Sequence, residues 1–249
     1  SGLLQELCEW EYDTVAFYER PWLHNLQQLY TGQHEFGAWT TGGAIRQHLG
    51  SWYQRPARRE VCFNHHMSHA AAGFQTSPFT KATVVVIDAI GEFDTVSIYG
   101  AHYVNGRAEY HRLWRQSYPH SIGLFYSAMT AEVGLKPMEE EYILMGMAGY
   151  GNPDIYYKDV LKYFPYTGKQ KYNYHKGIHD WPYKILTEQD KFDIAAAVQK
   201  IYENKFRHQL IKARRLAGSL NLALAGGCAL NCVANTIAWG YFRDVWIFP

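Results

Sequence analysis

Residues 82–114, ATVVVIDAIGEFDTVSIYGAHYVNGRAEYHRLW, decide the fold of this chain. The stretch opens with a run of apolar, mostly β-branched residues, which predicts a buried strand over 82–88. An Asn-Gly dipeptide at 105–106 is a strong hairpin signal between two alternating segments, so 94–104 and 107–114 are predicted to be two further strands. The sequence therefore predicts three consecutive antiparallel strands.

Shorter segments on both sides extend this pattern. Upstream, we expect a strand, two helices, a short strand and a histidine-containing helix, at residues 12–18, 21–34, 44–49, 60–63 and 64–74. Downstream, we expect a helix, a long amphipathic helix, a strand, a helix and a strand, at residues 121–133, 189–216, 222–225, 229–239 and 245–248.

Three antiparallel strands followed by alternating helices and strands are typical of a ribonuclease-H-like unit. Actin, sugar kinases and heat-shock ATPases use two such units around a nucleotide cleft, so we predict an α/β fold of this actin-like, sugar-kinase-like ATPase class. Residues 1–81 would be the remainder of the first unit, with the histidine helix. Residues 82–249 would be the second unit, and we expect the fold to be truncated at both ends.

Composition limits the partners of the chain. The 24 Lys and Arg residues almost balance 23 Asp and Glu residues, and a net charge of +1 predicts no electrostatic binding to nucleic acid or to a membrane surface.

The four cysteines, Cys8, Cys62, Cys228 and Cys232, lie mostly in apolar segments, as reduced thiols of a cytoplasmic protein do. A zinc site at Cys228 and Cys232 is not expected, because no second Cys/His pair lies near them.

His65, His69 and Asp88 are the candidate metal ligands. The two histidines are four residues apart in a predicted helix, so both imidazoles project from one face, and Asp88 ends the first buried strand. Two imidazoles and a carboxylate suit iron, zinc or manganese. The alternative is that the histidines only satisfy a buried helix.

Three glycine-containing segments are candidate nucleotide contacts. Gly91 follows the Asp88 strand end, Ser121–Gly123 open a helix whose free amides favour anions, and the run LAGGCALN at 224–231 is a strand, a double glycine and a helix. Gly226 and Gly227 would let the backbone approach an adenosine, and Asn231 offers a donor and an acceptor. Each segment alone is more often an ordinary turn.

The chain resembles the nodulation-type and antibiotic carbamoyltransferases, which include tobramycin and cephem tailoring enzymes. The matching stretches cover nearly the whole chain: YDTVAFYERPW (12–22), HHMSHAAAGF (65–74), VVVIDAIGE (84–92), PHSIGLFYSAMT (119–130), EYILMGMAGYGNP (141–153) and LALAGGCALNCVANT with FRDVWIFP (222–249). The resemblance implies an actin-like ATP-fold domain related to the tRNA threonylcarbamoyladenosine protein. It also implies a divalent metal, Fe(II) in the best-understood relative, at the positions of His65, His69 and Asp88.

The resemblance further implies a reaction. A carbamoyl group would pass from carbamoyl phosphate, through a carbamoyl-adenylate made from ATP, to a hydroxyl of a sugar or natural-product acceptor. A separate C-terminal YrdC-like domain would make the adenylate. Glu141 would hold the ribose, Gly91, Gly226 and Gly227 would frame the nucleotide, and His66 is a candidate acid or base, or a plain helix residue.

Two positions depart from the family pattern. Ile143 stands where many relatives have a lysine, and Ala89 stands where they commonly have glycine, which indicates altered nucleotide contacts. Two other classes of function stay open at this point. One is a catalytically idle nucleotide-binding module that acts through partner contacts, and the other is a two-His-one-carboxylate iron oxygenase, which needs no nucleotide cleft.

By the resemblance, relatives continue after Pro249 into a Gly-Asp-x-Gly turn whose Asp supplies another metal ligand, and a phosphate-cradling hairpin precedes Ser1. We therefore expect no carbamoyl transfer from carbamoyl phosphate and ATP by this chain alone, with activity restored in a longer protein. Turnover by the purified 249-residue chain would contradict that expectation.

Overall fold

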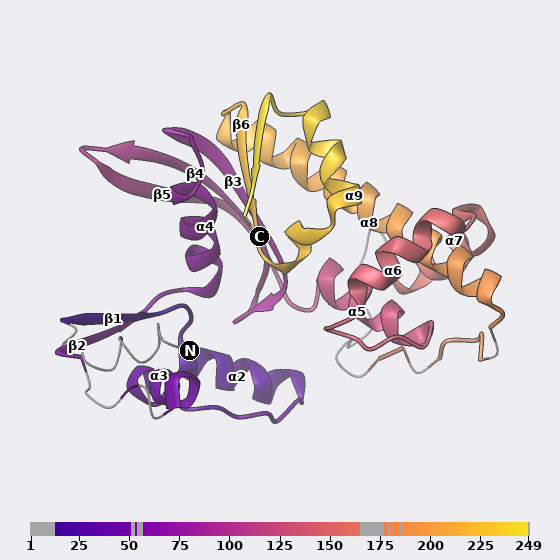
Figure 1. Cartoon of the computed structure of the whole chain (residues 1–249), viewed down its shortest axis with the longest axis horizontal. Helices are drawn as coiled ribbons and strands as arrows, with labels where there is room; N and C mark the ends of the chain where they lie inside the picture. Colours follow the sequence, from indigo (N-terminus) through magenta and orange to yellow (C-terminus); the bar gives the residue numbers. More distant parts are fainter. Residues whose placement is uncertain are drawn as a thin grey trace, which may run out of the picture. The chain divides into compact units, whose positions relative to one another are not determined.

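The computed structural model describes residues 13–248, apart from 51–52, 54–56, 165–176, 179 and 185 (Figure 1). Cys8, Tyr12 and Pro249 lie outside the described residues. The described chain divides into two compact units, one formed by residues up to 68 with 91–93 and the other by 69–90 with the residues from 94 onward. Among the described helices, none combines the length and the hydropathy that crossing a membrane requires.

The first unit contains a two-stranded parallel sheet and two helices. Strands β1 (Thr14–Phe17) and β2 (Arg59–Cys62) pair in parallel. Helix α2 (Pro21–Thr31) begins with proline at its first position, where the missing N–H costs nothing. Helix α3 (Thr41–Leu49) is capped by the Thr40 side chain. A small core holds the unit together, and its buried members are Phe17, Ala44, Ile45 and Tyr53.

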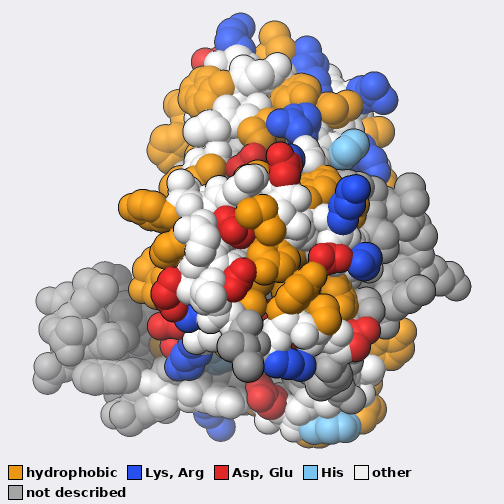
Figure 2. Space-filling model, turned by 90° about the vertical axis from the view of Figure 1, so that its right-hand side faces the viewer, with side chains coloured by type: hydrophobic (Ala, Val, Ile, Leu, Met, Phe, Trp, Pro, Cys, Tyr) orange, Lys and Arg blue, Asp and Glu red, His pale blue; other side chains and the backbone are white. Residues whose placement is uncertain are grey.

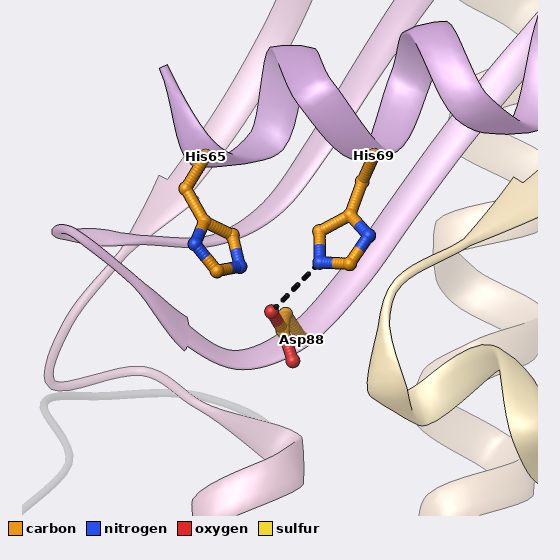
Figure 3. Close-up of side chains that lie close together, drawn as sticks. All are labelled: His65, His69 and Asp88. Carbon is orange, nitrogen blue, oxygen red and sulfur yellow. Dashed lines mark ion pairs between the residues drawn. The ribbon is translucent and has the colours of Figure 1, made fainter. Parts of the chain in front are cut away.

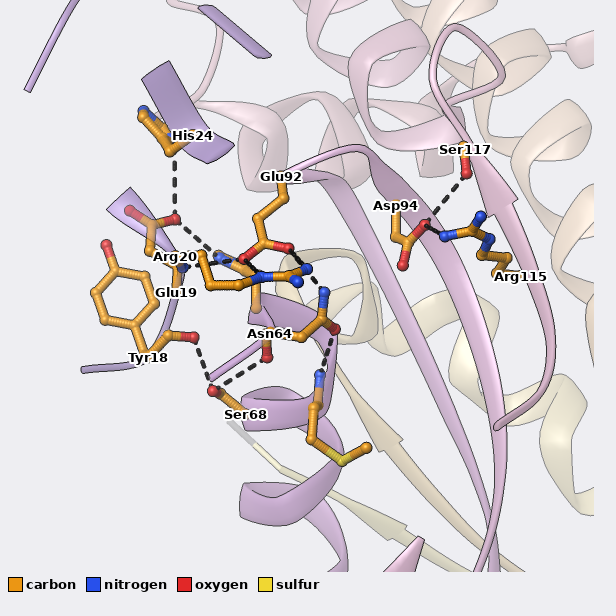
Figure 4. A network of polar contacts seen from close by, with 12 residues as sticks. Tyr18, Glu19, Arg20, His24, Asn64, Ser68, Glu92, Asp94, Arg115 and Ser117 are labelled. Atoms are coloured by element: carbon orange, nitrogen blue, oxygen red, sulfur yellow. Dashed lines mark hydrogen bonds and ion pairs between the residues drawn. The ribbon is translucent and has the colours of Figure 1, made fainter. Parts of the chain in front are cut away.

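A polar network fixes the start of helix α4 (His65–Gln75) within the first unit (Figure 4). The buried Glu92 carboxylate accepts hydrogen bonds from the Arg20 backbone N–H at 2.9 Å, from Arg20 Nε at 3.0 Å and from Asn64 Nδ2 at 2.8 Å. The Asn64 Oδ1 atom in turn accepts from the Met67 N–H in the first turn of α4 at 3.1 Å. These donors satisfy a carboxylate that would otherwise be costly to bury.

The second unit is built on a five-stranded mixed sheet. Its order is β5-β4-β3-β6-β7, in which β3 pairs with β6 and β6 with β7 in parallel, while β4 pairs with β5 antiparallel. Only Glu92 and Phe93 separate the neighbouring strands β3 and β4, so this pair is also antiparallel. The strands are β3 (Lys81–Gly91), β4 (Asp94–Val104), β5 (Arg107–Ser117), β6 (Asn221–Ala225) and β7 (Asp244–Ile247).

Helices cover both faces of this sheet. On one face, Val85 and Ile87 of β3 join a core with helices α5 (Ile122–Glu132) and α8 (Glu188–Ala217). On the other face lies α4, because the Phe74 ring contacts Tyr103 of β4 and Tyr110 of β5. The remaining helical elements are α6 (Glu141–Met147), α7 (Pro153–Tyr163), α9 (Cys232–Asn235) and short 3₁₀ turns at 148–150, 227–230 and 236–240.

The α/β class is confirmed, and the three predicted strands over 82–114 are present in a mixed sheet. The single helix predicted over 229–239 is wrong. Asn231 adopts a non-helical conformation (ψ 86°), and its side chain accepts a hydrogen bond from the Ala234 N–H. One helical segment therefore ends before Asn231, and another begins after it. Helix α7 was not predicted. The actin-like assignment and the division at residue 81 stay predictions.

The side chains on the face shown in Figure 2 mix both charge signs with apolar groups. Lysines and arginines are most frequent toward the top and right of this view and aspartates and glutamates toward its middle, so neither sign covers the whole face. The distribution on this face therefore matches the near-zero net charge of the sequence.

Candidate functional site: a metal-ligand cluster beside a pocket

Three potential metal ligands converge beside helix α4 (Figure 3). The ligand atoms of His65, His69 and Asp88 lie within 4.8 Å of one another, and His69 Nε2 lies 3.3 Å from Asp88 Oδ2. Helix α4 is continuous, so its pitch places the two histidines one turn apart on one side. The geometry therefore brings together the three residues that the sequence singled out as metal ligands.

Strand alternation explains why Asp88 points at the histidines. In β3, Val85 and Ile87 face the core formed with α5 and α8, so Val84, Val86 and Asp88 project from the opposite face, which α4 covers. The last residue of β3 that pairs with β6 is Val86. Asp88 thus lies just beyond the paired segment, where a side chain is accessible to a ligand.

The Glu19 carboxylate orients the His65 ring. Its Oε2 atom lies 3.3 Å from His65 Nδ1. Burial would raise the pKa of Glu19, but hydrogen bonds from His24 and His65 outweigh burial and lower that pKa to about 2. Glu19 is therefore ionised and accepts a hydrogen bond from the Nδ1–H group of His65, which leaves Nε2 of His65 as the nitrogen with the lone pair. Carboxylates commonly orient metal-binding histidines in this way.

A pocket of about 360 Å³ adjoins Asp88 within the second unit. Its lining is mixed, with the acidic groups Asp88, Glu139 and Glu141 and several apolar and aromatic side chains: Met138, Met145, Leu230, Tyr126, Tyr142 and Tyr202. Pockets of this size hold small molecules. Among the predicted nucleotide contacts, Gly123, Glu141, Gly227 and Asn231 line this pocket, whereas Gly91 and Gly226 are not part of its lining.

The two glycines of the double-glycine turn have different surroundings. Gly226 has φ 92°, and a Cβ there would overlap the Ile87 carbonyl oxygen and lie 2.9 Å from the Ile87 carbonyl carbon. Position 226 therefore requires glycine, because the backbone after β6 packs closely against the backbone of β3. A Cβ at Gly227 would lie 3.2 Å from Asp88 Oδ1, on the pocket side. Of the two glycines, Gly227 is therefore the one that leaves space beside Asp88, the candidate metal ligand.

Gly91 and Gly123 are also explained by close packing. A Cβ at Gly91 would lie 2.5 Å from His65 Cδ2, so glycine lets the histidine helix approach the strand end. A Cβ at Gly123 would lie 2.7 Å from the Ala89 Cα, and the preceding Ser121 donates its Oγ proton to the Ala89 carbonyl. These contacts fix the start of α5 against the end of β3.

The polar pocket residues are held in place by hydrogen bonds. Glu141 Oε1 accepts from Ser127 Oγ at 2.5 Å and from the Met138 N–H at 2.6 Å. Asn231 and Gln199 exchange two hydrogen bonds of 2.9 and 3.1 Å between their amide groups. These side chains are pre-oriented, which lowers the entropic cost of binding a ligand.

His66 and Cys228 are less suited to acid–base or nucleophilic roles. His66 is fully buried beneath Gly91. Burial raises the pKa of the Cys228 thiol, and the Asp88 and Glu141 carboxylates raise it further, so the thiol stays protonated. A protonated thiol is neither a good nucleophile nor a metal ligand.

The sequence reasoning missed Glu19, Tyr126, Ser127 and Gln199. Glu19 follows a predicted strand directly, and an acidic residue at that place is a signal of the kind that identified Asp88. Gln199 lies in the middle of α8, where no local pattern distinguishes it from a solvent-facing polar residue.

Comparison with known proteins adds a family. The family described as "Carbamoyltransferase N-terminus" matches residues 43–249. The uncharacterized protein sll1178 of Synechocystis is 36% identical over 213 residues, covering 76% of this chain and 34% of that protein. Nodulation protein NolO of Bradyrhizobium diazoefficiens is 29% identical over 197 residues, with 75% of this chain and 35% of that protein covered. Nodulation protein NolNO of Sinorhizobium fredii is 29% identical over 200 residues, with coverages of 75% and 28%. The chain spans about a third of the length of these relatives.

Proposed function

Since the chain belongs to the carbamoyltransferase family, through that family's N-terminal domain, we propose that it is the metal-dependent transfer domain of an enzyme that carbamoylates a hydroxyl group. The carbamoyl donor is carbamoyl phosphate, activated with ATP as a carbamoyl-adenylate. The acceptor is a sugar or another natural product. One observation carries the proposal: Asp88 belongs both to the metal-ligand cluster and to the lining of the pocket.

The donor set at the cluster fits a divalent metal ion. Two imidazoles and one carboxylate suit Fe(II), zinc and manganese, and three protein ligands leave coordination positions for substrate or water. Glu19 supports this use because it fixes the tautomer of His65. When bound, the cation would polarise the carbamoyl carbonyl or lower the pKa of the acceptor hydroxyl. We propose Fe(II) as the resident ion.

The pocket is the proposed site of the adenylate. Gly227 leaves its backbone bare on the pocket side, and Tyr126, Tyr142 and Tyr202 offer aromatic surface to a purine. Glu141 is held by Ser127 with its second oxygen available to ribose hydroxyls. In this arrangement the chain's residues orient the carbamoyl group toward Asp88, and a domain outside this chain makes the adenylate.

Substituting aspartate for Gly227 tests the nucleotide half of this proposal. The new side chain would enter the pocket within reach of Asp88 Oδ1 and place a second carboxylate beside it. We expect the affinity for AMP and for ATP to fall by at least about tenfold in calorimetric titrations, because the ligand phosphate then faces two carboxylates.

The matched control is Gly227→Asn, which adds nearly the same volume without the charge. We expect it to weaken binding less than Gly227→Asp does. Equal affinity of the wild-type chain and the Gly227→Asp variant would place the nucleotide elsewhere. Metal content measured on the same samples separates loss of nucleotide from disturbance of Asp88.

A further inference from the structure

A second group of potential metal ligands lies on the β4–β5 hairpin. The ligand atoms of His102, Glu109 and His111 lie within 4.8 Å of one another. A single oxygen, Glu109 Oε2, is 4.0 Å from His102 Nε2 and 3.9 Å from His111 Nε2. The two imidazole rings stack with centroids 5.6 Å apart and an angle of 20° between their planes. Two ring nitrogens thus flank one carboxylate oxygen.

Strand pairing holds the three side chains on one face of the sheet. His102 pairs directly with Glu109 across the antiparallel ladder, and His111 lies two residues further along β5. Tyr103 and Tyr110, the neighbours in sequence, point to the opposite face, where they contact Phe74 of α4. The backbone of the hairpin therefore fixes all three Cα positions before any ion binds.

The spacing suits a metal ion better than direct hydrogen bonds. Distances of 3.9 and 4.0 Å exceed the range of a nitrogen–oxygen hydrogen bond. Ligand atoms around a tetrahedral zinc ion lie about 3.3 Å apart, so each nitrogen–oxygen distance would have to shorten by about 0.6–0.7 Å. The side chains are 37%, 49% and 64% exposed for His102, Glu109 and His111, which leaves room for such movement and for a water ligand.

We propose that His102, Glu109 and His111 form a second divalent-metal site, which accepts zinc, on the outer hairpin of the sheet. Imidazole nitrogens with one carboxylate are zinc ligands, and the open fourth position is taken by water. The bound ion links β4 to β5 near the hairpin turn. This site is independent of the nucleotide pocket and of the proposed reaction. A negative result for this site would therefore leave the proposed function unchanged, and the reverse also holds.

The test uses the full chain carrying His65→Ala and His69→Ala, so that the first cluster does not contribute. Calorimetric titration with zinc chloride should then give one zinc ion per chain. Adding His102→Gln and His111→Gln should lower the zinc affinity by at least about 100-fold. Loss of a residue that only supports a metal ligand already lowers metal affinity about 10–100-fold, and loss of two ligands should have a larger effect. The matched control is His208→Gln, an exposed histidine on α8, which should leave the affinity unchanged.

A second variant and a second measurement keep the test decisive. Glu109→Gln keeps the shape of the side chain and should weaken zinc binding by at least about tenfold, because the charged ligand is lost. Zinc should also raise the melting temperature of the chain with the hairpin intact and not that of the His102→Gln/His111→Gln chain. Equal zinc affinities and equal melting shifts in these two chains would overturn the proposal.

Discussion

We expect the chain with both His65→Ala and His69→Ala to lose nearly all of the divalent metal that the proposed site would hold. Only Asp88 of the three clustered ligands then remains, and a single carboxylate does not hold a transition metal against solvent. Loss of even a supporting partner of a metal ligand lowers affinity about 10–100-fold, so loss of two ligands should lower it by more than about 100-fold. We expect each single substitution to remove most of the metal as well.

The measurement is elemental analysis after anaerobic loading with Fe(II) and gel filtration in a weak chelator, which removes ions from exposed histidines. His208→Ala is the control for a histidine on another helix. The fold should survive, because both side chains are partly exposed and alanine is a better helix former than histidine. Full metal occupancy in the double variant would end the assignment. A collapse of the helical circular dichroism would show instead that the histidines are structural.

The Glu19 contact gives that experiment an internal check. Glu19→Gln keeps a hydrogen-bond acceptor near His65 Nδ1 but removes the carboxylate charge that supports the ring's basicity. Metal affinity should fall in this variant by less than it falls in His65→Ala. An orienting role predicts this order, and a purely structural role does not.

The parts of the fold that follow from the sequence are those set by local patterns. The strands over 82–114 follow from an apolar run and an Asn-Gly turn, and α8 follows from its amphipathic stripe. His65 and His69 are paired by helical spacing alone. Local information is sufficient wherever the deciding neighbours are within about one turn of a helix or one hairpin.

The parts that the sequence did not give depend on contacts between distant residues. Glu19 meets His65 across 46 positions, and Asn231 meets Gln199 across 32. The break in the predicted 229–239 helix is of this kind, since the Asn231 side chain both caps α9 and pairs with α8. The apolar pattern there predicts one helix, although Asn231 is itself a residue type that commonly caps helices.

The double glycine is another case that local sequence could not decide. Both glycines were predicted to be nucleotide contacts, but only Gly227 lines the pocket. The structure assigns Gly226 to packing, and this has a large expected consequence. Gly226→Ala should destabilise the chain by about 3–5 kcal/mol in chemical denaturation. Part of this cost is a left-handed φ of 92° for a residue with a Cβ, and the rest is overlap of that Cβ with the backbone of Ile87.

Gly218→Ala is the comparison variant. Gly218 also has a positive φ (70°), but its ψ is −9°, whereas Gly226 combines φ 92° with ψ 160°, a conformation that residues with a Cβ essentially do not adopt. A Cβ at Gly218 would meet no atom within 4 Å. Its substitution should therefore cost only the milder backbone strain, about 1 kcal/mol. The difference between the two variants measures the overlap with β3 together with the stronger backbone strain at Gly226. If the two substitutions cost the same, neither the close approach of Gly226 to Ile87 nor its backbone conformation is what requires glycine in the turn that positions Gly227 beside Asp88.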